Sequence, residues 1–565
     1  METYMQSYNE WLNNPVLDAD SRNELLKIKD DTKEIAERFH QNLEFGTGGL
    51  RGIIGAGTNR MNVYTVRRAG QGLAEYILAQ KGGEGAKRGI VISHDNRHFS
   101  REFAIETALV MAQNGIRAYI FEDLRPTPQL SFAIRHLGCV SGVMVTASHN
   151  PPEYNGYKAY WEDGGQLVFP QDEEVIEYVN NITDPIALKV MPKEDAIEKG
   201  LLTFLGKDID EAFLAKVQTL ALNKEIVAQM ADDFTVVYSP LHGTGGMPVR
   251  QALLNAGFKN VHIVKEQFEP DPNFTTTKNP NPEDPAAFAM GIDLAKQVNA
   301  DIIVTNDPDA DRMGAMVKNA AGEYELLSGN ATGAILAEYL LSCKAAAGTL
   351  PKNAGIVSTY VSTRLTAEIC KAYGARYTET LTGFKHIAKQ ILEWEQDNTT
   401  EFLFGFEESF GYMIGGFCRD KDAISASMLM CEAAAFYTSQ NKTLFDALED
   451  IFKKYGYFKE LGHSVTLRGR DGAAKIRQMI ADLRQNPPKC LAGIDIAEIR
   501  DFATYTPASD MLFYTLSDQS WFCVRPSGTE PKIKFYIGTK AATAKEADAQ
   551  LAALSQALFA HMGLE

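Results

Sequence analysis

The chain lacks the features that would place it among secreted, metal-cysteine or membrane proteins. Its seven cysteines are odd in number and widely spaced, and no CxxC pair occurs, which argues against a disulfide framework and a zinc site. No uncharged run approaches the roughly 18 residues that a membrane-spanning helix requires. The N-terminus shows no basic region followed by an apolar stretch. We therefore expect a cytoplasmic protein with no membrane partner.

Positive charge is also scarce, because the formal net charge is -17. This balance argues against a nucleic-acid partner. An anionic small substrate remains compatible, since Arg525, Lys532 and Lys534 supply local cations near the C-terminus. With 565 residues, 45% of them hydrophobic, the chain exceeds the size of a single core, so about three to five domains are expected.

Strands and helices are predicted to alternate through most of the chain. The first 40 residues show a helical pattern, and β-rich runs at 89–95, 117–123 and 142–148 then alternate with helices such as 101–115. Two further segments repeat this α/β theme. The remainder, from about residue 458, has an α+β pattern. In each α/β segment a strand ends in a polar loop, which is where open α/β sheets bind ligands.

We predict an α/β fold of four domains around a central cleft: three related mixed α/β domains and a C-terminal α+β domain. The predicted boundaries are 1–205, 206–322, 323–457 and 458–565. Each domain is expected to contribute one polar loop to the cleft. The cleft requires only one chain, so a monomer is the default expectation. A proline-rich stretch at 269–284 is predicted to form a long surface loop.

The first polar loop is TASHNPPEYNGYK, at residues 146–158. Its two adjacent prolines and its glycine exclude a regular helix or a central strand, so Ser148 is expected on a rigid loop. A hydroxyl held in this way is a candidate nucleophile or phosphoryl carrier. His149 is adjacent, but neighbouring residues on an extended segment point to opposite sides and no GxSxG motif occurs. A serine–histidine dyad is therefore not expected.

The second polar loop, DPDADR, places Asp307, Asp309 and Asp311 at every second position. In an extended loop this spacing would turn all three carboxylates to one side. Three clustered anions require a cation, and oxygen ligands without nearby cysteine or histidine favour Mg²⁺. A solvated acidic turn is the alternative. An EF-hand is excluded, because no glycine stands at the sixth position of the loop and no glutamate at its twelfth.

Two further loops are less specific by themselves. RPSGTEPK, at 525–532, offers a guanidinium, two hydroxyls, a glycine amide and a lysine, a donor set that suits a phosphate dianion as well as it suits a plain turn. GFEESFGY, at 405–412, could bind sugar hydroxyls through two carboxylates and a serine, although an exposed acidic turn explains it better in isolation.

Two glycine-rich segments match no phosphate-binding motif. FGTGGLRG, at 45–52, differs from GxGxxG, and LHGTGG, at 241–246, lacks the ending of a P-loop. Both are interpreted as tight turns. Arg51, in the first of them, is kept as a candidate phosphate contact.

Together, and in this order, the four polar loops resemble those of the α-D-phosphohexomutase superfamily over nearly the whole chain. The loop GFEESFGY is similar to that of the glucose-preferring phosphoglucomutases. The metal loop usually reads DGDGDR in this superfamily, whereas Pro308 and Ala310 replace its glycines here. This variant resembles the branch that contains bacterial phosphoglucomutases and animal phosphopentomutases, and it leaves the three aspartates intact.

The resemblance implies a role for each predicted domain and for specific residues. In chain order the domains would be an N-terminal extension with a phosphoserine domain, a metal-binding domain, a sugar-binding domain and a phosphate-binding domain. The implied Mg²⁺ ligands are phosphorylated Ser148, Asp307, Asp309 and Asp311. Candidate general bases are Lys158 and Lys421, and Arg51 and His149 would support catalysis. The implied substrate contacts are Arg312, Thr382, Gly383, Lys385, Glu407, Ser409, Arg525, Ser527, Gly528, Thr529 and Lys532.

The implied activity is a Mg²⁺-dependent phosphoglucomutase of glucose metabolism, acting on small sugar phosphates. It would interconvert glucose 1-phosphate and glucose 6-phosphate, with glucose 1,6-bisphosphate as intermediate and activator. Either lysine would need a lowered pKa to act as a base. The alternatives are a phosphopentomutase, a phosphomannomutase or a glucose-1,6-bisphosphate synthase on the same fold, a non-catalytic sugar-phosphate-binding regulator, and a phosphatase.

Overall fold

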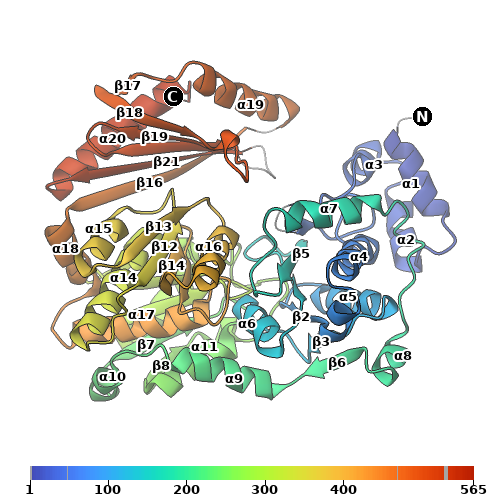
Figure 1. The fold of residues 1–565 in the computed structure, drawn as a ribbon, viewed down its shortest axis with the longest axis horizontal. Coiled ribbons are helices and arrows are strands. Elements are labelled where there is room, and N and C mark those ends of the chain that lie inside the picture. Colours follow the sequence, from blue (N-terminus) through green and yellow to red (C-terminus); the bar gives the residue numbers. More distant parts are fainter. Residues whose placement is uncertain (1–2, 47–48, 468, 527–531, 565) are drawn as a thin grey trace.

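Four β-sheets organise the chain in a computed structural model that describes residues 3–46, 49–467, 469–526 and 532–564 (Figure 1). The first three sheets are mixed and are packed with helices, and the fourth is antiparallel. The predicted fold class, three α/β domains followed by an α+β domain, is confirmed. None of the described helices combines the length and apolar character needed to span a bilayer.

The first domain contains a six-stranded sheet in the order β1-β5-β4-β2-β3-β6. Its central strands β2 and β4 are buried along their whole length, as expected for parallel strands covered by helices on both faces. Among the described strand pairs of this sheet, β1–β5 and β4–β5 are antiparallel, and the other pairs are parallel. The strands are β1 (Leu50–Ile53), β2 (Ile90–His94), β3 (Ala118–Phe121), β4 (Ser141–Val145), β5 (Tyr154–Trp161) and β6 (Leu202–Leu205). The helices are α4 (Val63–Arg88), α5 (Ser100–Gln113), α6 (Thr127–Leu137), α7 (Gln171–Asn181) and α8 (Lys193–Glu198).

Three short helices precede this sheet, as the sequence predicts: α1 (Thr3–Asn13), α2 (Ala19–Lys27) and α3 (Thr32–Phe39). They form a small apolar core of their own, in which the rings of Tyr8 and Trp11 meet Phe39 edge to face, and they dock on α4 through Tyr64. Glu24 accepts the amide N–H of Ala56 at 3.1 Å. The helices thereby support the turn that follows strand β1.

The second and third domains repeat the α/β arrangement. The second sheet has the order β11-β10-β9-β7-β8 and the third the order β13-β12-β14-β15. The second domain comprises α9 (Lys207–Gln218), α10 (Lys224–Met230), β7 (Thr235–Ser239), α11 (Gly246–Ala256), β8 (Asn260–Ile263), α12 (Lys265–Phe268), η1 (Pro285–Phe288), α13 (Ala289–Val298), β9 (Ile302–Asn306), β10 (Met313–Lys318) and β11 (Tyr324–Leu326). The third comprises α14 (Gly329–Ala346), β12 (Ala354–Thr359), α15 (Leu365–Tyr373), β13 (Arg376–Thr380), α16 (Phe384–Asp397), β14 (Glu401–Glu407), β15 (Gly411–Ile414), α17 (Ala423–Thr438) and α18 (Leu444–Tyr455).

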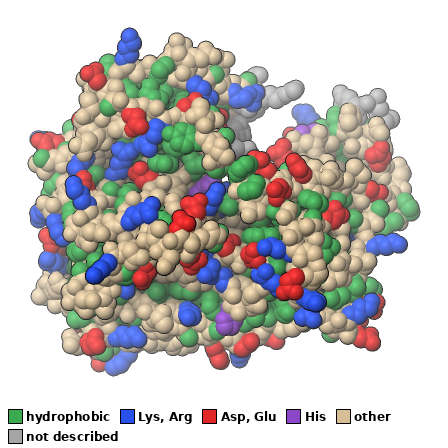
Figure 2. All heavy atoms as spheres, in the orientation of Figure 1, with side chains coloured by type: hydrophobic (Ala, Val, Ile, Leu, Met, Phe, Trp, Pro, Cys, Tyr) green, Lys and Arg blue, Asp and Glu red, His purple; other side chains and the backbone are tan. Residues whose placement is uncertain are grey.

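The fourth domain is an antiparallel sheet in the order β16-β21-β20-β19-β18-β17, with α19 and α20 packed against it. Its elements are β16 (Tyr457–Thr466), α19 (Gly469–Gln485), β17 (Cys490–Leu491), β18 (Ile494–Asp501), η2 (Phe502–Thr504), β19 (Leu512–Leu516), β20 (Trp521–Pro526), β21 (Lys532–Ala541) and α20 (Ala544–His561). Space-filling atoms show a hollow between this domain, at the upper left of Figure 2, and the first domain at the right. The predicted domain boundaries remain predictions.

The proline-rich segment 269–284 contains no helix or strand, as expected of a long surface loop, but it is anchored to the first domain. Phe274 within it is only 2% exposed, and the guanidinium of Arg97 from the first domain lies 5.0 Å from the centre of its ring. The backbone carbonyl of Asp271 accepts a hydrogen bond from Asn96 at 2.9 Å. The segment therefore fastens the second domain to the first, close to the serine loop.

Candidate active site

Ser148 lies just beyond the C-terminal end of β4 in a strained, buried turn. Its φ is 52°, in the left-handed region that non-glycine residues seldom adopt, and the residue is only 4% exposed. Its amide N–H donates to Thr146 Oγ1 at 2.8 Å. Ser148 lies in neither a helix nor a strand, as the prolines predict.

Arg97 holds the backbone of the serine loop through hydrogen bonds. It was not among the site residues predicted from the sequence. Its buried guanidinium donates to the backbone carbonyl of Ser148 at 2.5 Å and also to three other carbonyls of the same loop. Asp95 pairs with Arg97 at 3.3 Å and accepts the hydroxyl of Ser100 at 2.6 Å. The one feature of the sequence that could have pointed to Arg97 is its position shortly after the predicted strand at 89–95. The other three carbonyls belong to Asn150, Pro151 and Tyr154.

Ser148 and His149 are in contact, contrary to the prediction that their side chains diverge. The distance between Ser148 Oγ and His149 Nδ1 is 3.2 Å. The prediction assumed an extended segment, whereas the left-handed turn at Ser148 swings the two side chains together. Burial, followed by the nearby cations Arg312 and Arg51, lowers the pKa of His149 well below its ordinary value. His149 is therefore a neutral imidazole at pH 7.

The metal loop between β9 and β10 is a tight turn and not the extended segment that the alternating aspartates suggested. Ala310 adopts a φ of 50°. Asp307 Oδ1 accepts the amide N–H groups of Asp311 at 3.1 Å and Arg312 at 2.9 Å. The turn, and not strand-like alternation, is what brings the carboxylates together. One oxygen from each of Asp307, Asp309 and Asp311 lies within 4.8 Å of the others.

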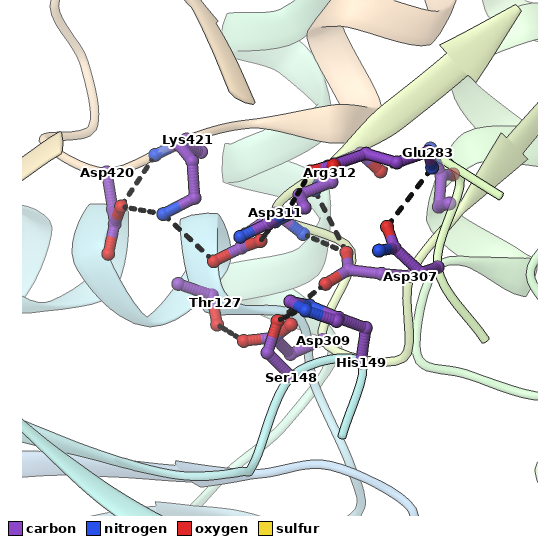
Figure 3. Close-up of polar contacts among 12 residues, drawn as sticks. Thr127, Ser148, His149, Glu283, Asp307, Asp309, Asp311, Arg312, Asp420 and Lys421 are labelled. Atoms are coloured by element: carbon purple, nitrogen blue, oxygen red, sulfur yellow. Dashed lines mark hydrogen bonds and ion pairs between the residues drawn. The ribbon is translucent and has the colours of Figure 1, made fainter. Parts of the chain in front are cut away.

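The serine loop and the metal loop meet directly, although they are 159 residues apart in the chain (Figure 3). Ser148 Oγ donates to Asp307 Oδ2 at 2.8 Å. A phosphoryl group on Ser148 would therefore be formed beside the three carboxylates. The geometry brings the predicted carrier and the predicted metal ligands into one site.

Two buried lysines neutralise part of the acidic cluster. Lys158, on β5, places Nζ 2.7 Å from Asp309 Oδ2 and 3.4 Å from Asp311 Oδ2. Lys421, in the loop before α17, places Nζ 3.1 Å from Asp311 Oδ2 and 3.1 Å from Asp420 Oδ1. Thr127, at the start of α6, donates its hydroxyl to Asp309 Oδ2 at 2.8 Å.

These lysines do not have the lowered pKa that a general base needs. Burial lowers the pKa of Lys158, but Asp309 and Asp311 outweigh it, so the pKa is raised. Burial likewise opposes Asp311 and Asp420 at Lys421, and its pKa is again raised. Burial raises the pKa of Asp307, whereas Lys158 helps to lower that of Asp309 despite its burial. In this arrangement both lysines are protonated.

The carboxylate cluster fits a hard divalent cation. Asp309 Oδ1 and Asp311 Oδ1 are buried, and neither accepts a hydrogen bond within the part of the chain that the structure describes. Buried carboxylate oxygens without partners are costly unless a cation or a donor reaches them. Three oxygen ligands without sulfur or imidazole suit Mg²⁺.

The predicted sugar loop lies at the end of β14 and faces the loop before α16. Glu407 Oε1 accepts the amide N–H of Gly383 at 2.8 Å, and burial raises its pKa. Ser409 stands in the turn that follows β14. Lys385 Nζ donates to Asp172 Oδ2 on α7 at 3.1 Å, a bond that joins the third domain to the first.

Two arginines, Arg312 of the metal loop and Arg51 of strand β1, contact residues next to the site. Arg312 Nη1 donates to Glu283 Oε1 at 2.5 Å, so the end of the proline-rich segment reaches the metal loop. Arg51, on the edge strand β1, donates to Asn150 Oδ1 of the serine loop at 3.1 Å. Sequence reasoning did not single out Glu283, Thr127 or Asp420, whose roles depend on contacts distant in sequence.

The phosphate loop of the fourth domain is described only at its ends. Arg525, the second-last residue of β20, donates to the hydroxyl of Thr382 in the third domain. Lys532 opens β21, and Arg525 pairs in register with Lys534 of that strand. Three predicted phosphate contacts, Ser527, Gly528 and Thr529, lie outside the described residues.

Three consecutive segments of the chain match known domain families. Residues 42–185, 211–322 and 328–455 match the phosphoglucomutase/phosphomannomutase alpha/beta/alpha domains I, II and III. A phosphoglucomutase of Staphylococcus haemolyticus is 37% identical over 513 residues, which cover 88% of this chain and 90% of that protein. The chain belongs to the phosphoglucomutase/phosphomannomutase family. The expected superfamily is confirmed, and the protein is a mutase enzyme.

Other relatives agree in sequence and in fold. A phosphoglucomutase of Staphylococcus aureus strain MRSA252 is 34% identical over 524 residues, 90% of this chain and 91% of that protein. The solved structure of a Thermus thermophilus protein titled a putative phosphomannomutase shares the fold with a TM-score of 0.69 at 21% identity, covering 93% and 99% of the two chains. Parafusin from Paramecium, titled a phosphoglucomutase in an open form, has a TM-score of 0.68 at 17% identity, covering 93% and 94%.

Proposed function

We propose that the protein interconverts glucose 1-phosphate and glucose 6-phosphate by passing a phosphoryl group through Ser148. The observation that carries the proposal is the 2.8 Å hydrogen bond from Ser148 Oγ to Asp307 Oδ2, which sets a strained, buried hydroxyl against a triad of carboxylates. A phosphomonoester is very resistant to hydrolysis, so an enzyme gains by transferring the group and never releasing it.

In the proposed cycle, phosphorylated Ser148 donates its phosphoryl group to the free hydroxyl of the bound sugar phosphate. The bond from phosphorus to Ser148 Oγ breaks, a bond to the sugar oxygen forms, and the hydroxyl proton passes to a base. The product is glucose 1,6-bisphosphate. After it turns over in the cleft, its other phosphoryl group returns to Ser148, and the isomer leaves.

Asp307, Asp309, Asp311 and the phosphoserine are the proposed holders of Mg²⁺. When bound, Mg²⁺ neutralises the charge of the transferring phosphoryl group. The carboxylates themselves then have less negative charge to offer Lys158 and Lys421. The pKa values of the two lysines, which these carboxylates raise in this arrangement, would then fall toward the range that a general base requires.

The second phosphate of the substrate is assigned to the fourth domain. Arg525 and Lys532 stand at the two ends of the phosphate loop in the fourth domain, whereas Ser148 belongs to the first domain. Two anions are thereby kept apart and each is paired with cations. Glu407, the last residue of β14, and Ser409, in the turn that follows, are proposed to bind the sugar hydroxyls in both orientations of the intermediate.

A coupled assay tests the proposal. Purified protein receives glucose 1-phosphate, Mg²⁺ and a trace of glucose 1,6-bisphosphate, with ribose 1-phosphate and mannose 1-phosphate compared under the same conditions. Preference for glucose supports the proposal, whereas preference for ribose or mannose refutes the substrate. Ser148→Ala should abolish turnover while its circular dichroism stays that of the unmodified protein, and appreciable residual turnover would refute the carrier role.

A further inference from the structure

The glycine-rich segment LHGTGG, at 241–246, does more than turn the chain after β7. Leu241 and His242 have φ values of 45° and 65°, so two successive non-glycine residues occupy the left-handed region. His242 is held there, because its ring contacts Thr276 Oγ1 at 2.8 Å and its amide N–H donates to Gln267 at 2.8 Å. The strain is confined to a segment that lies against the metal loop.

Thr244 binds the backbone of the metal loop twice. Its amide N–H donates to the carbonyl oxygen of Pro308 at 2.8 Å, and its hydroxyl donates to the same oxygen at 3.0 Å. Thr244 is only 4% exposed, so both bonds are protected from water. The carbonyl of Pro308 belongs to the same planar peptide group as the N–H of Asp309. Holding this carbonyl in place therefore also fixes the backbone of Asp309, one of the proposed metal ligands.

Gly243 allows this close approach. A Cβ at Gly243 would lie 2.4 Å from Pro308 Cα and 2.5 Å from its carbonyl oxygen, far inside van der Waals contact with backbone atoms. Gly243 does not occupy the left-handed region. A glycine is therefore needed at this position because a side chain would clash with Pro308, and not because of its backbone angles. Gly243→Ala consequently tests the steric contact alone.

The next carbonyls of the metal loop are held by other domains. The carbonyl of Asp309 accepts the N–H of Thr127 at 2.9 Å, and that of Ala310 accepts the N–H of Ala423 at 3.2 Å. Thr127 belongs to the first domain and Ala423 begins α17. Pro308 and Ala310 stand where the family pattern has glycines, so the loop has little backbone freedom of its own.

We infer that Thr244 and Gly243 are positioning residues of the metal site. They act through the Pro308 carbonyl and place Asp309 for the cation, without touching the metal or the substrate. The inference rests on the metal site proposed above. It predicts that weakening this support lowers Mg²⁺ affinity specifically, and leaves the binding of the sugar phosphate unchanged.

The test is Mg²⁺ alone, titrated calorimetrically into the chelator-treated full-length protein. Thr244→Val removes the hydroxyl donor and should raise the Kd for Mg²⁺ about fivefold, the loss of one hydrogen bond. Thr244→Ser keeps the donor and should retain the original Kd. Gly243→Ala should raise the Kd roughly tenfold or more, because the loop backbone must shift. In the activity assay, half-saturating Mg²⁺ should rise in parallel while KM for glucose 1-phosphate stays constant.

Thr305→Val is the matched control. Thr305 lies on β9 shortly before the metal loop, is fully buried, and its hydroxyl has no hydrogen-bond partner among the described residues. It should leave the Kd unchanged. Equal Mg²⁺ affinity of the Val and Ser variants at Thr244, or an equal loss in Thr305→Val, would overturn the inference. Unmodified protein that binds no Mg²⁺ would overturn the proposed metal site as well, whereas normal Mg²⁺ results without glucose turnover would refute only the substrate.

Discussion

Replacing Lys158 by methionine should destabilise the protein in a way that Mg²⁺ reverses. The substitution keeps the length of the side chain and removes its charge. In the folded protein Lys158 Nζ lies 2.7 Å from Asp309 Oδ2 and 3.4 Å from Asp311 Oδ2, and the lysine side chain is 10% exposed. Its removal leaves two buried carboxylates with one fewer cation.

The expected loss follows from this geometry. Removing one partner of a buried ion pair costs about 3–5 kcal/mol. The lower end applies here, because Lys421 still reaches Asp311 at 3.1 Å and Thr127 still donates to Asp309 at 2.8 Å. For a domain of this size, about 3 kcal/mol corresponds to a fall of about 6–12 °C in the thermal midpoint. Mg²⁺ supplies the missing positive charge, so the difference should shrink at saturating Mg²⁺.

Differential scanning calorimetry, with chelator and with Mg²⁺, measures this difference. Lys81→Met is the control: Lys81 forms a 2.7 Å ion pair with Glu162 in which both side chains are 32% exposed, so its loss should cost under about 1 kcal/mol and ignore Mg²⁺. Turnover by Lys158→Met should also fall about 10²- to 10⁴-fold if this lysine is the base. A loss of stability that is the same with and without Mg²⁺ would refute the idea that the lysine and the metal share these carboxylates.

Three further changes have defined outcomes. Burial, and then Glu407, raises the pKa of Glu408 to about 7, so the folded protein keeps a proton that the unfolded chain releases, and stability falls as pH rises from about 4.5 to 7. In urea titrations, Glu408→Gln should therefore raise the free energy of unfolding by up to about 3 kcal/mol at pH 8 and leave it unchanged near pH 4.5. Arg97→Lys should lower kcat roughly 10- to 100-fold at constant KM, because an ammonium cannot reach four carbonyls, and unchanged kcat would contradict this role. Glu283→Gln frees Arg312, so inhibition by inorganic phosphate should strengthen roughly threefold, and weaker inhibition would show that Glu283 instead orients the arginine.

Much of the fold could be predicted from local patterns. The alternation of β-rich runs with helices predicts the α/β domains, and the structure places strands at nearly the expected positions, such as β2 at Ile90–His94. The polar loops follow strand ends, so sequence order alone indicates that they face one cleft. The side-chain geometry of the loops was predicted less well. The carboxylates converge because Ala310 adopts a left-handed backbone conformation. Alanine seldom adopts this conformation, so it could not be predicted from the sequence.

The sequence by itself therefore determined the chemistry of this protein: a serine, three aspartates and a basic loop, each within a short motif, with a family resemblance that the comparisons confirm. Only the tertiary structure decided which of these groups meet. The bond from Ser148 to Asp307, the lysines shared around Asp311 and the support by Thr244 all join distant segments. The direction of each pKa shift depends on burial and on neighbouring charges, which are properties of the packed molecule and not of a motif.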